Sequence, residues 1–181
     1  KPYQPISISP SARALHYGQA CFEGMKAFKD DLGKVWLFRP KDNHHRMVKS
    51  SERLAMPAFK EELFIEAITN LINLDKDWVK TGIGNSLYIR PFIFADQDSI
   101  NANEATEYKF IIICAPAKSY YSGDVKVKIE KSFSRASKGG VGYAKAAGNY
   151  AAQFYPTLIA RKEGFQQVIW TDSSNHEYIE E

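Results

Sequence analysis

The chain has 181 residues, of which 44% are hydrophobic and 13% aromatic, enough for a sizeable core in one domain, or one small domain plus part of another. Its net charge of +3 is spread without any run of five like charges, which argues against nucleic acid and an anionic membrane as partners. The two cysteines, Cys21 and Cys114, lie far apart among apolar neighbours, which argues against a metal site or a redox pair.

The ends of the chain carry little that is typical of a natural terminus. It begins at Lys1 without an initiator methionine or a signal-peptide pattern, and it ends on two adjacent glutamates after a strand-like run. No apolar stretch approaches the roughly 20 residues that a membrane helix needs. We therefore expect a fragment cut at both ends of a cytoplasmic protein, with an organelle as the alternative if a leader is missing.

The first part of the chain predicts a strand followed by two helices. Residues 34–39 are rich in β formers and stand between Gly33 and Pro40, which indicates a strand with a hard stop. A helix capped by Asp42 or Asn43 should follow and end before Pro57. Residues 61–74 predict the next helix, because apolar side chains recur at helical spacing on one face: Phe64, Ala67, Ile68, Leu71 and Ile72.

Two further strands are expected at residues 86–95 and 108–114, which are dense in Ile, Phe and Tyr. The polar segment 118–124 contains Gly123 and indicates a domain junction. The fold class is therefore predicted to be α+β, with a small N-terminal domain at residues 1–120 and the beginning of a second domain at residues 121–181.

The second domain should open with an alternating strand at residues 125–129, followed by a glycine-rich loop at 138–142. A helix is expected at about residues 149–163 and a strand at 167–171. Pro156 falls inside that helix, where it would cost about 3 kcal/mol, so we expect a kink or a late helix start.

The segment from Gly139 to Tyr150 places Lys145 among small residues between the glycine-rich loop and the helix. One interpretation is an ordinary solvated loop lysine. A nucleotide phosphate loop fails, because that pattern requires Gly-Lys-Ser/Thr and Lys145 stands between two alanines. A third interpretation is a lysine that binds a carbonyl cofactor covalently, since such an amine needs small neighbours so that a flat ring can approach.

Four separated blocks give the chain a family resemblance. They are Leu15 to Phe28, Leu37 to Arg46, Leu87 to Pro91 and Lys145 to Tyr150. In this order they resemble the branched-chain amino-acid aminotransferases, which are fold-type IV enzymes that depend on pyridoxal phosphate. One departure is Ala147, where the family usually has the first glycine of Gly-Gly-Asn-Tyr.

The resemblance implies a role for four residues at the cofactor. Lys145 would hold pyridoxal phosphate covalently and shuttle the substrate proton. Arg46 would grip the phosphate, Tyr150 would lie near the phenolic oxygen, and Glu181 would pair with the pyridine nitrogen. Taken alone, Arg46 resembles a helix-surface arginine and Glu181 a solvated terminal glutamate.

The resemblance also implies a substrate pocket, formed by Tyr17, Phe22, Tyr88, Arg90 and Tyr120. Aromatic walls suit the side chains of leucine, isoleucine or valine, although aromatic residues in strands more often serve packing. The implied reaction moves the amino group of these substrates to 2-oxoglutarate in two half-reactions. A homodimer is also implied, with a loop at Asp98 to Asn103 reaching the partner's active site.

Three alternatives remain open at this point. D-amino-acid aminotransferase and aminodeoxychorismate lyase share the fold and the cofactor lysine, and the first and third blocks favour the branched-chain type over both. The chain alone could also be a weak, inactive or non-catalytic piece of such an enzyme.

His44 and His45 are adjacent without a spaced carboxylate or cysteine partner, so we interpret them as helix or loop residues and expect no metal site.

Overall fold

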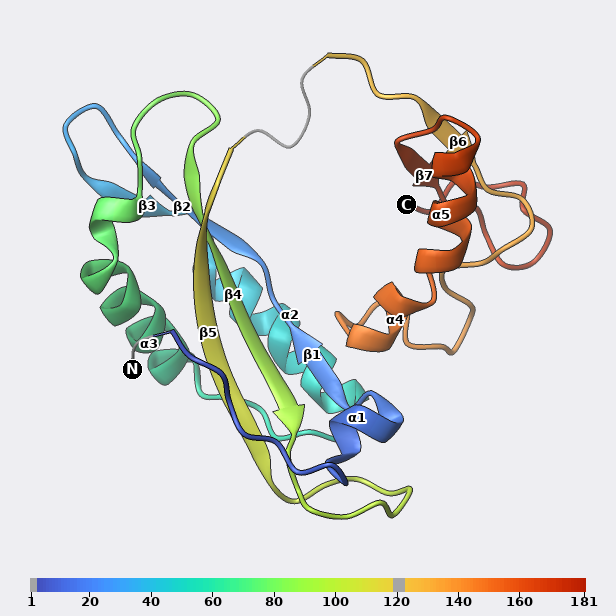
Figure 1. Cartoon of the computed structure of the whole chain (residues 1–181), viewed down its shortest axis with the longest axis horizontal. Coiled ribbons are helices and arrows are strands. Elements are labelled where there is room, and N and C mark those ends of the chain that lie inside the picture. Colours follow the sequence, from blue (N-terminus) through green and yellow to red (C-terminus); the bar gives the residue numbers. More distant parts are fainter. Residues whose placement is uncertain (1–2, 119–122) are drawn as a thin grey trace.

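The computed structural model describes residues 3–118 and 123–181, which form a twisted antiparallel sheet with helices and a smaller unit that carries Lys145 (Figure 1). In chain order the elements are α1 (Arg13–Tyr17), β1 (Ala20–Phe22), β2 (Met25–Lys29), β3 (Val35–Leu37), α2 (Pro40–Arg53), α3 (Glu61–Leu74), the 3-10 turn η1 (Lys76–Trp78), β4 (Ser86–Ala95), β5 (Tyr108–Ala117), β6 (Val127–Ile129), α4 (Ala147–Ala151), α5 (Phe154–Lys162) and β7 (Gln167–Ile169). The predicted α+β class is confirmed.

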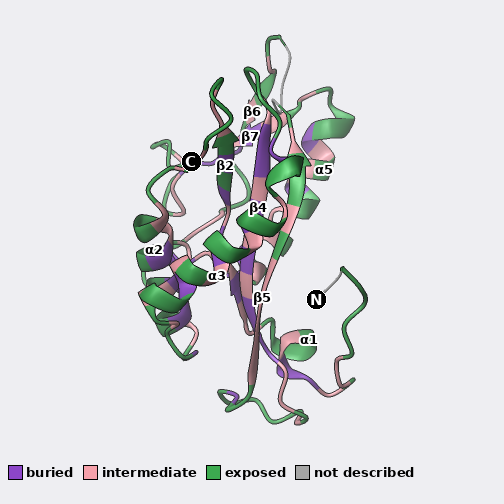
Figure 2. Ribbon diagram, turned by 90° about the vertical axis from the view of Figure 1, so that its left-hand side faces the viewer, coloured by how far each residue is buried: buried purple, intermediate pink, exposed green. Residues whose placement is uncertain are grey.

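Strand β4 is the centre of the large sheet. It pairs along its whole length with β5 on one edge, and β1 and β2 pair with it one after the other on the opposite edge. Figure 2 shows β4 as largely buried. Its side chains alternate: Leu87, Ile89 and Ile93 enter the core shared with α2 and α3. The residues between them, Tyr88, Arg90 and Phe92, are half-buried on the other face.

The backbone pairing along this edge of β4 is interrupted between β1 and β2. Glu23 and Gly24 fall between the two registers, opposite Arg90 and Pro91. Pro91 has no N–H to donate, so the contact that remains is the Glu23 N–H to the Pro91 carbonyl at 2.8 Å. This gap in the ladder gives Glu23 a position that ordinary strand pairing would not allow, and it lies beside Phe22.

The smaller unit contains β6 and β7, which pair in parallel, with α5 packed against β7. A short segment of it returns to the large sheet: Ala146 forms an antiparallel bridge with Cys21, and α4 contacts β1. Lys145 and Ala146 therefore lie along the edge of β1 that faces away from β4. No helix in the described ranges is both long and apolar enough to cross a membrane.

The elements agree with the sequence prediction at several places and differ at others. The helix at Glu61–Leu74 is confirmed with the predicted bounds. The preceding helix begins at Pro40 and not at Asp42 or Asn43, because proline suits the first helical position, where its missing N–H costs nothing. In place of the single helix predicted at residues 149–163, the structure has two helices, α4 and α5. Pro156 is the third residue of α5, which agrees with the predicted late start of the helix.

Candidate active site

The Lys145 amine lies between a phenol and an aromatic ring. Its Nζ donates a hydrogen bond to the Tyr150 hydroxyl at 2.6 Å, and it lies 4.7 Å from the centre of the Phe22 ring. The rings of Phe22 and Tyr150 are themselves 4.8 Å apart. An ammonium group is attracted to such π faces, so the two rings limit where the half-buried lysine can point. The structure thus brings together three of the predicted residues.

Residues from distant parts of the chain hold the backbone around Lys145. The Lys145 N–H donates to Ser50 Oγ at 2.8 Å, and the Lys145 carbonyl accepts from the Phe22 N–H at 3.1 Å. The carbonyls of Val141 and Ala144, which precede the lysine, both accept hydrogen bonds at 2.8 Å from the buried side-chain amide of Asn149, which follows it. The loop that carries the lysine is therefore fastened at both ends.

Arg46 lies on α2, and its guanidinium is held by a fully buried carboxylate. Its Nε and Nη2 donate to the two oxygens of Glu23 at 2.6 and 2.7 Å, and Asn43 donates to the same carboxylate at 2.9 Å. Glu23 is 0% exposed, whereas the Arg46 side chain keeps 49% of its surface exposed. This hydrogen bonding to Glu23 raises the pKa of Arg46, so the guanidinium is a fixed positive charge.

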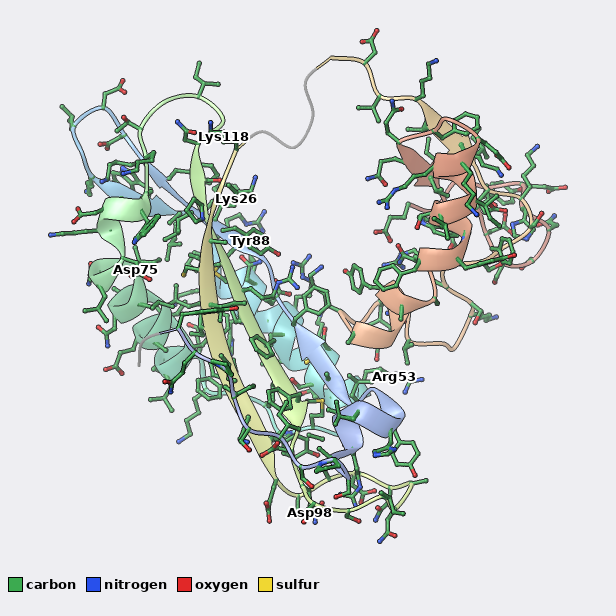
Figure 3. The ribbon with its side chains drawn as sticks, viewed as in Figure 1. Lys26, Arg53, Asp75, Tyr88, Asp98 and Lys118 are labelled. Atoms are coloured by element: carbon green, nitrogen blue, oxygen red, sulfur yellow. The ribbon has the colours of Figure 1, made fainter. Side chains whose placement is uncertain are left out.

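Tyr88 and Arg90 form a second polar pair on the site face of β4. Arg90 Nη2 donates to the Tyr88 hydroxyl at 2.6 Å, and the guanidinium lies 4.2 Å from the centre of the Phe22 ring. Lys26 stands opposite Tyr88 on β2, as Figure 3 shows. Phe22 therefore has Lys145 and Arg90 against its ring, and it joins the lysine to the predicted substrate residues.

Tyr17 lies apart from this group. Its hydroxyl donates to the Ile100 carbonyl at 2.5 Å, so it belongs with the loop at residues 98–103. Figure 3 shows Asp98 at the opposite end of the sheet from Lys26 and Tyr88. The buried Arg13 organises this loop by donating to the Asn101 carbonyl at 2.9 Å and to the side chains of Gln97, Ser99 and Asn103.

Glu181 and Tyr120 complete the predicted set. Glu181 forms an ion pair with Arg135 Nε at 2.5 Å, and Arg135 Nη1 donates to the Gly142 carbonyl at 3.2 Å. Arg135 thus joins Glu181 to the glycine-rich loop before Lys145. Tyr120 lies outside the described residues, as does the predicted domain boundary beside it.

The two adjacent histidines meet a carboxylate that sequence spacing did not reveal. Glu61, at the start of α3, lies 3.5 Å from His45 Nε2 and 3.9 Å from His44 Nδ1. Its other oxygen already receives the Lys41 ammonium at 2.9 Å. That cation would repel a metal ion, so we interpret the cluster as polar contacts between α2 and α3 around the Lys41–Glu61 ion pair.

Sequence reasoning missed the residues that support the site. Glu23 stands inside the first resemblance block, but nothing local indicates that its carboxylate is buried beneath Arg46. Ser50 lies one helical turn after Arg46, and this spacing is the only local signal that both face the same place. No local sequence pattern distinguishes Arg135 from other arginines of the chain.

Comparison with known proteins decides the family. The model of the family described as amino-transferase class IV matches residues 20–180. The chain belongs to the class IV aminotransferases. It is 46% identical to branched-chain-amino-acid transaminase 1 of Bacillus subtilis and 47% identical to a probable branched-chain-amino-acid aminotransferase of Staphylococcus epidermidis, in each case over 99% of this chain. It spans about half the length of these relatives, 52% and 51%.

Solved structures of the same kind share the fold. The branched-chain amino acid aminotransferase from Escherichia coli aligns with a TM-score of 0.74 at 26% identity, over 97% of this chain and 55% of that one. The branched-chain aminotransferase from the thermophilic archaeon Thermoproteus uzoniensis, solved with norvaline, aligns with a TM-score of 0.71 at 20% identity, over 92% and 55%. This class IV chain is thus similar to slightly more than half of each enzyme.

Proposed function

We propose that this class IV chain belongs to a branched-chain amino-acid aminotransferase that depends on pyridoxal phosphate. The enzyme would transfer the amino group of leucine, isoleucine or valine to 2-oxoglutarate. The observation that carries the proposal is the Lys145 amine, held 2.6 Å from the Tyr150 hydroxyl and against the Phe22 ring. The names of the relatives at 46% and 47% identity support the same reaction.

The donor set fits pyridoxal phosphate. Lys145 offers a primary amine for the aldehyde, and Tyr150 offers a hydroxyl next to that amine for the phenolic oxygen. Arg46 turns two nitrogens toward Glu23 and keeps half of its side chain exposed, so another edge of the fork can meet the phosphate. Glu181 would pair with the pyridine nitrogen while Arg135 fixes its carboxylate.

The bound cofactor would act as an electron sink for the bond broken at the substrate's α-carbon. The Lys145 amine would then take and return the α-proton, because it would be freed when the substrate amine binds. Tyr150 orients that amine. Phe22 and Tyr88 supply apolar surface for a branched side chain, and Arg90 supplies a positive charge that suits the second carboxylate of 2-oxoglutarate.

We also propose a cytoplasmic homodimer and two domains with a boundary near residue 120. The Tyr17 hydroxyl donates to the Ile100 carbonyl, so Tyr17 is joined to the loop at residues 98–103 and not to the group around Lys145. This arrangement suits a unit that completes the active site of a partner subunit. Tyr120 is proposed to line the pocket.

The experiment that tests the function is a visible spectrum of the protein with pyridoxal phosphate, followed by borohydride reduction and peptide mapping. We expect a pH-dependent absorbance band and a reduced cofactor adduct on Lys145. Lys145→Ala should lose both and lower leucine turnover roughly 100- to 10,000-fold. Lys138→Ala is the matched control, because it removes an exposed lysine from the same segment.

If the wild type and Lys145→Ala trap the cofactor alike, Lys145 is not the attachment point and the proposal falls. Substrate assays separate the related activities. Transfer from L-leucine to 2-oxoglutarate supports the branched-chain type, whereas exclusive use of D-amino acids or of aminodeoxychorismate contradicts it.

A further inference from the structure

Ser50 is a buried serine on α2 that makes two well-formed hydrogen bonds with its one hydroxyl. The hydroxyl donates to the Arg46 carbonyl at 2.8 Å, and its oxygen accepts the Lys145 backbone N–H at 2.8 Å. Ser50 is 0% exposed, so no water can replace either partner without a rearrangement of the protein. The hydroxyl proton is committed to Arg46, which leaves the oxygen's lone pair directed at Lys145.

The large sheet domain therefore satisfies both backbone groups of Lys145. The N–H binds Ser50 of α2, and the carbonyl binds the Phe22 N–H of β1. Ala146 continues this contact through its bridge with Cys21. The backbone of the residue that would react is thus bound by Ser50, 95 positions earlier in the chain, and by Phe22 of β1.

We propose that Ser50 is a positioning residue for Lys145, acting through the backbone and without touching the reacting atoms. The inference rests on the proposed function, because it assumes that the amine of Lys145 reacts. Arg46 and Ser50 are one turn apart, about 6 Å along the axis of α2. One helical turn consequently fixes both the arginine proposed for the cofactor phosphate and the lysine proposed for its carbonyl.

The adjacent Ser51 provides a matched control. It is 2% exposed on the same helix, and its hydroxyl lies 3.5 Å from Cys21 Sγ. Ser50→Ala and Ser51→Ala each delete one buried hydroxyl and create the same residue. The variants differ in whether the lost hydroxyl is the one that holds Lys145.

The first measurement is amide hydrogen exchange by NMR on the protein without cofactor. The Lys145 N–H is itself the donor to Ser50, so Ser50→Ala should speed its exchange about tenfold. The Ala144 N–H donates to the Val141 carbonyl at 3.0 Å and should exchange as in the wild type. Ser51→Ala should leave both amides unchanged, and Ser50→Thr, which keeps the hydroxyl, should restore slow exchange at Lys145.

Equal exchange at Lys145 in Ser50→Ala and the wild type would overturn the proposal. A parallel rise at Ala144 and Lys145 in both alanine variants would also overturn it, because it would show a general loss of stability. This measurement needs no cofactor, so it decides the role of Ser50 even if the wild type fails to bind pyridoxal phosphate and the proposed function falls.

The second measurement is the rate at which pyridoxal phosphate becomes trapped on Lys145 by borohydride. We expect Ser50→Ala to slow trapping at Lys145 several-fold and Ser51→Ala to leave it unchanged, with Ser50→Thr close to the wild type. Unchanged trapping in Ser50→Ala, in a wild type that does trap cofactor, would show that the bond does not position the amine and would overturn the proposal.

Discussion

The large sheet with its helices and the smaller unit contribute to the candidate site in different ways. The large sheet and its helices supply two buried polar groups. Glu23 binds Arg46 on α2, and Ser50 accepts the backbone N–H of Lys145 from the smaller unit while it donates to Arg46 on its own helix. In the smaller unit, Asn149 and Asp172 instead bind backbone groups five to eight positions away in the chain. The comparison indicates that the large sheet and α2 supply long-range contacts to which the lysine segment is bound.

The largest expected effect comes from removing the cation that covers Glu23. Arg46→Met should lower the free energy of unfolding by about 3 kcal/mol, because it leaves a fully buried carboxylate without its counter-charge. Glu23→Gln should cost only about 1 kcal/mol, because the half-exposed guanidinium can turn to water. Urea denaturation of both variants measures the difference.

The difference between the two losses distinguishes a buried ion pair from an ordinary surface ion pair. Equal losses in the two variants, both below about 1 kcal/mol, would show that Glu23 is solvated in practice and that its bonds to α2 contribute little to the stability of the large sheet. Asn43→Ala serves as the control, since it removes a neutral donor to the same carboxylate and leaves the ion pair in place.

The fold was predictable where the signal is local. Residues 61–74 show a helical period on one face, and the structure has a helix with those bounds. Strands β1 and β2 were missed because they have only three and five residues. Their partners on β4 lie 60 to 74 positions away, and the local pairing of β2 with β3 covers only three residues of each strand. The sequence predicts Pro40 as a strand stop, and in the structure the same residue also starts α2.

The site was predictable only through the resemblance. Local composition left Lys145 open as a solvated loop residue, and the structure places its amine against Phe22 and Tyr150. The bond between Ser50 and Lys145 joins positions 95 apart, so no window of sequence could contain it. Long-range backbone contacts of this kind depend on the completed fold.

Two glycines, one between strands of the large sheet and one in the smaller unit, provide the next test of the comparison. A methyl group on Gly24 would lie 2.3 Å from the Tyr88 hydroxyl, which Arg90 holds at 2.6 Å. Gly24→Ala should therefore displace Tyr88, cost about 1–2 kcal/mol and raise the KM for leucine. A methyl group on Gly148 would meet nothing within 4 Å, so Gly148→Ala in α4 should stabilise the protein by about 0.5 kcal/mol.

Thermal denaturation and leucine kinetics of the two glycine variants measure these effects. A neutral Gly24→Ala would mean that Tyr88 moves freely and that the site face of β4 is soft. Loss of stability in Gly148→Ala would mean that α4 is packed more tightly than its exposed glycine indicates.

The smallest effect concerns the turn that leads to Glu181, which Asp172 holds through hydrogen bonds from the backbone N–H groups of Tyr178, Glu177, Ser174 and Asn175. These bonds, that from Tyr178 first, lower the pKa of Asp172 from 3.8 to about 2. Because the folded pKa is the lower one, the carboxylate stabilises the turn fully above about pH 4, and this contribution is lost as the pH falls toward 2. The amide shifts of Glu177 and Tyr178, followed by NMR against pH, should titrate with a midpoint near 2, and Asp172→Asn should abolish that transition. A midpoint near 3.8 would show that the turn is open in solution. The carboxylate proposed to meet the cofactor ring would then be positioned by the ion pair with Arg135 and by the backbone hydrogen bonds between Glu181 and Trp170.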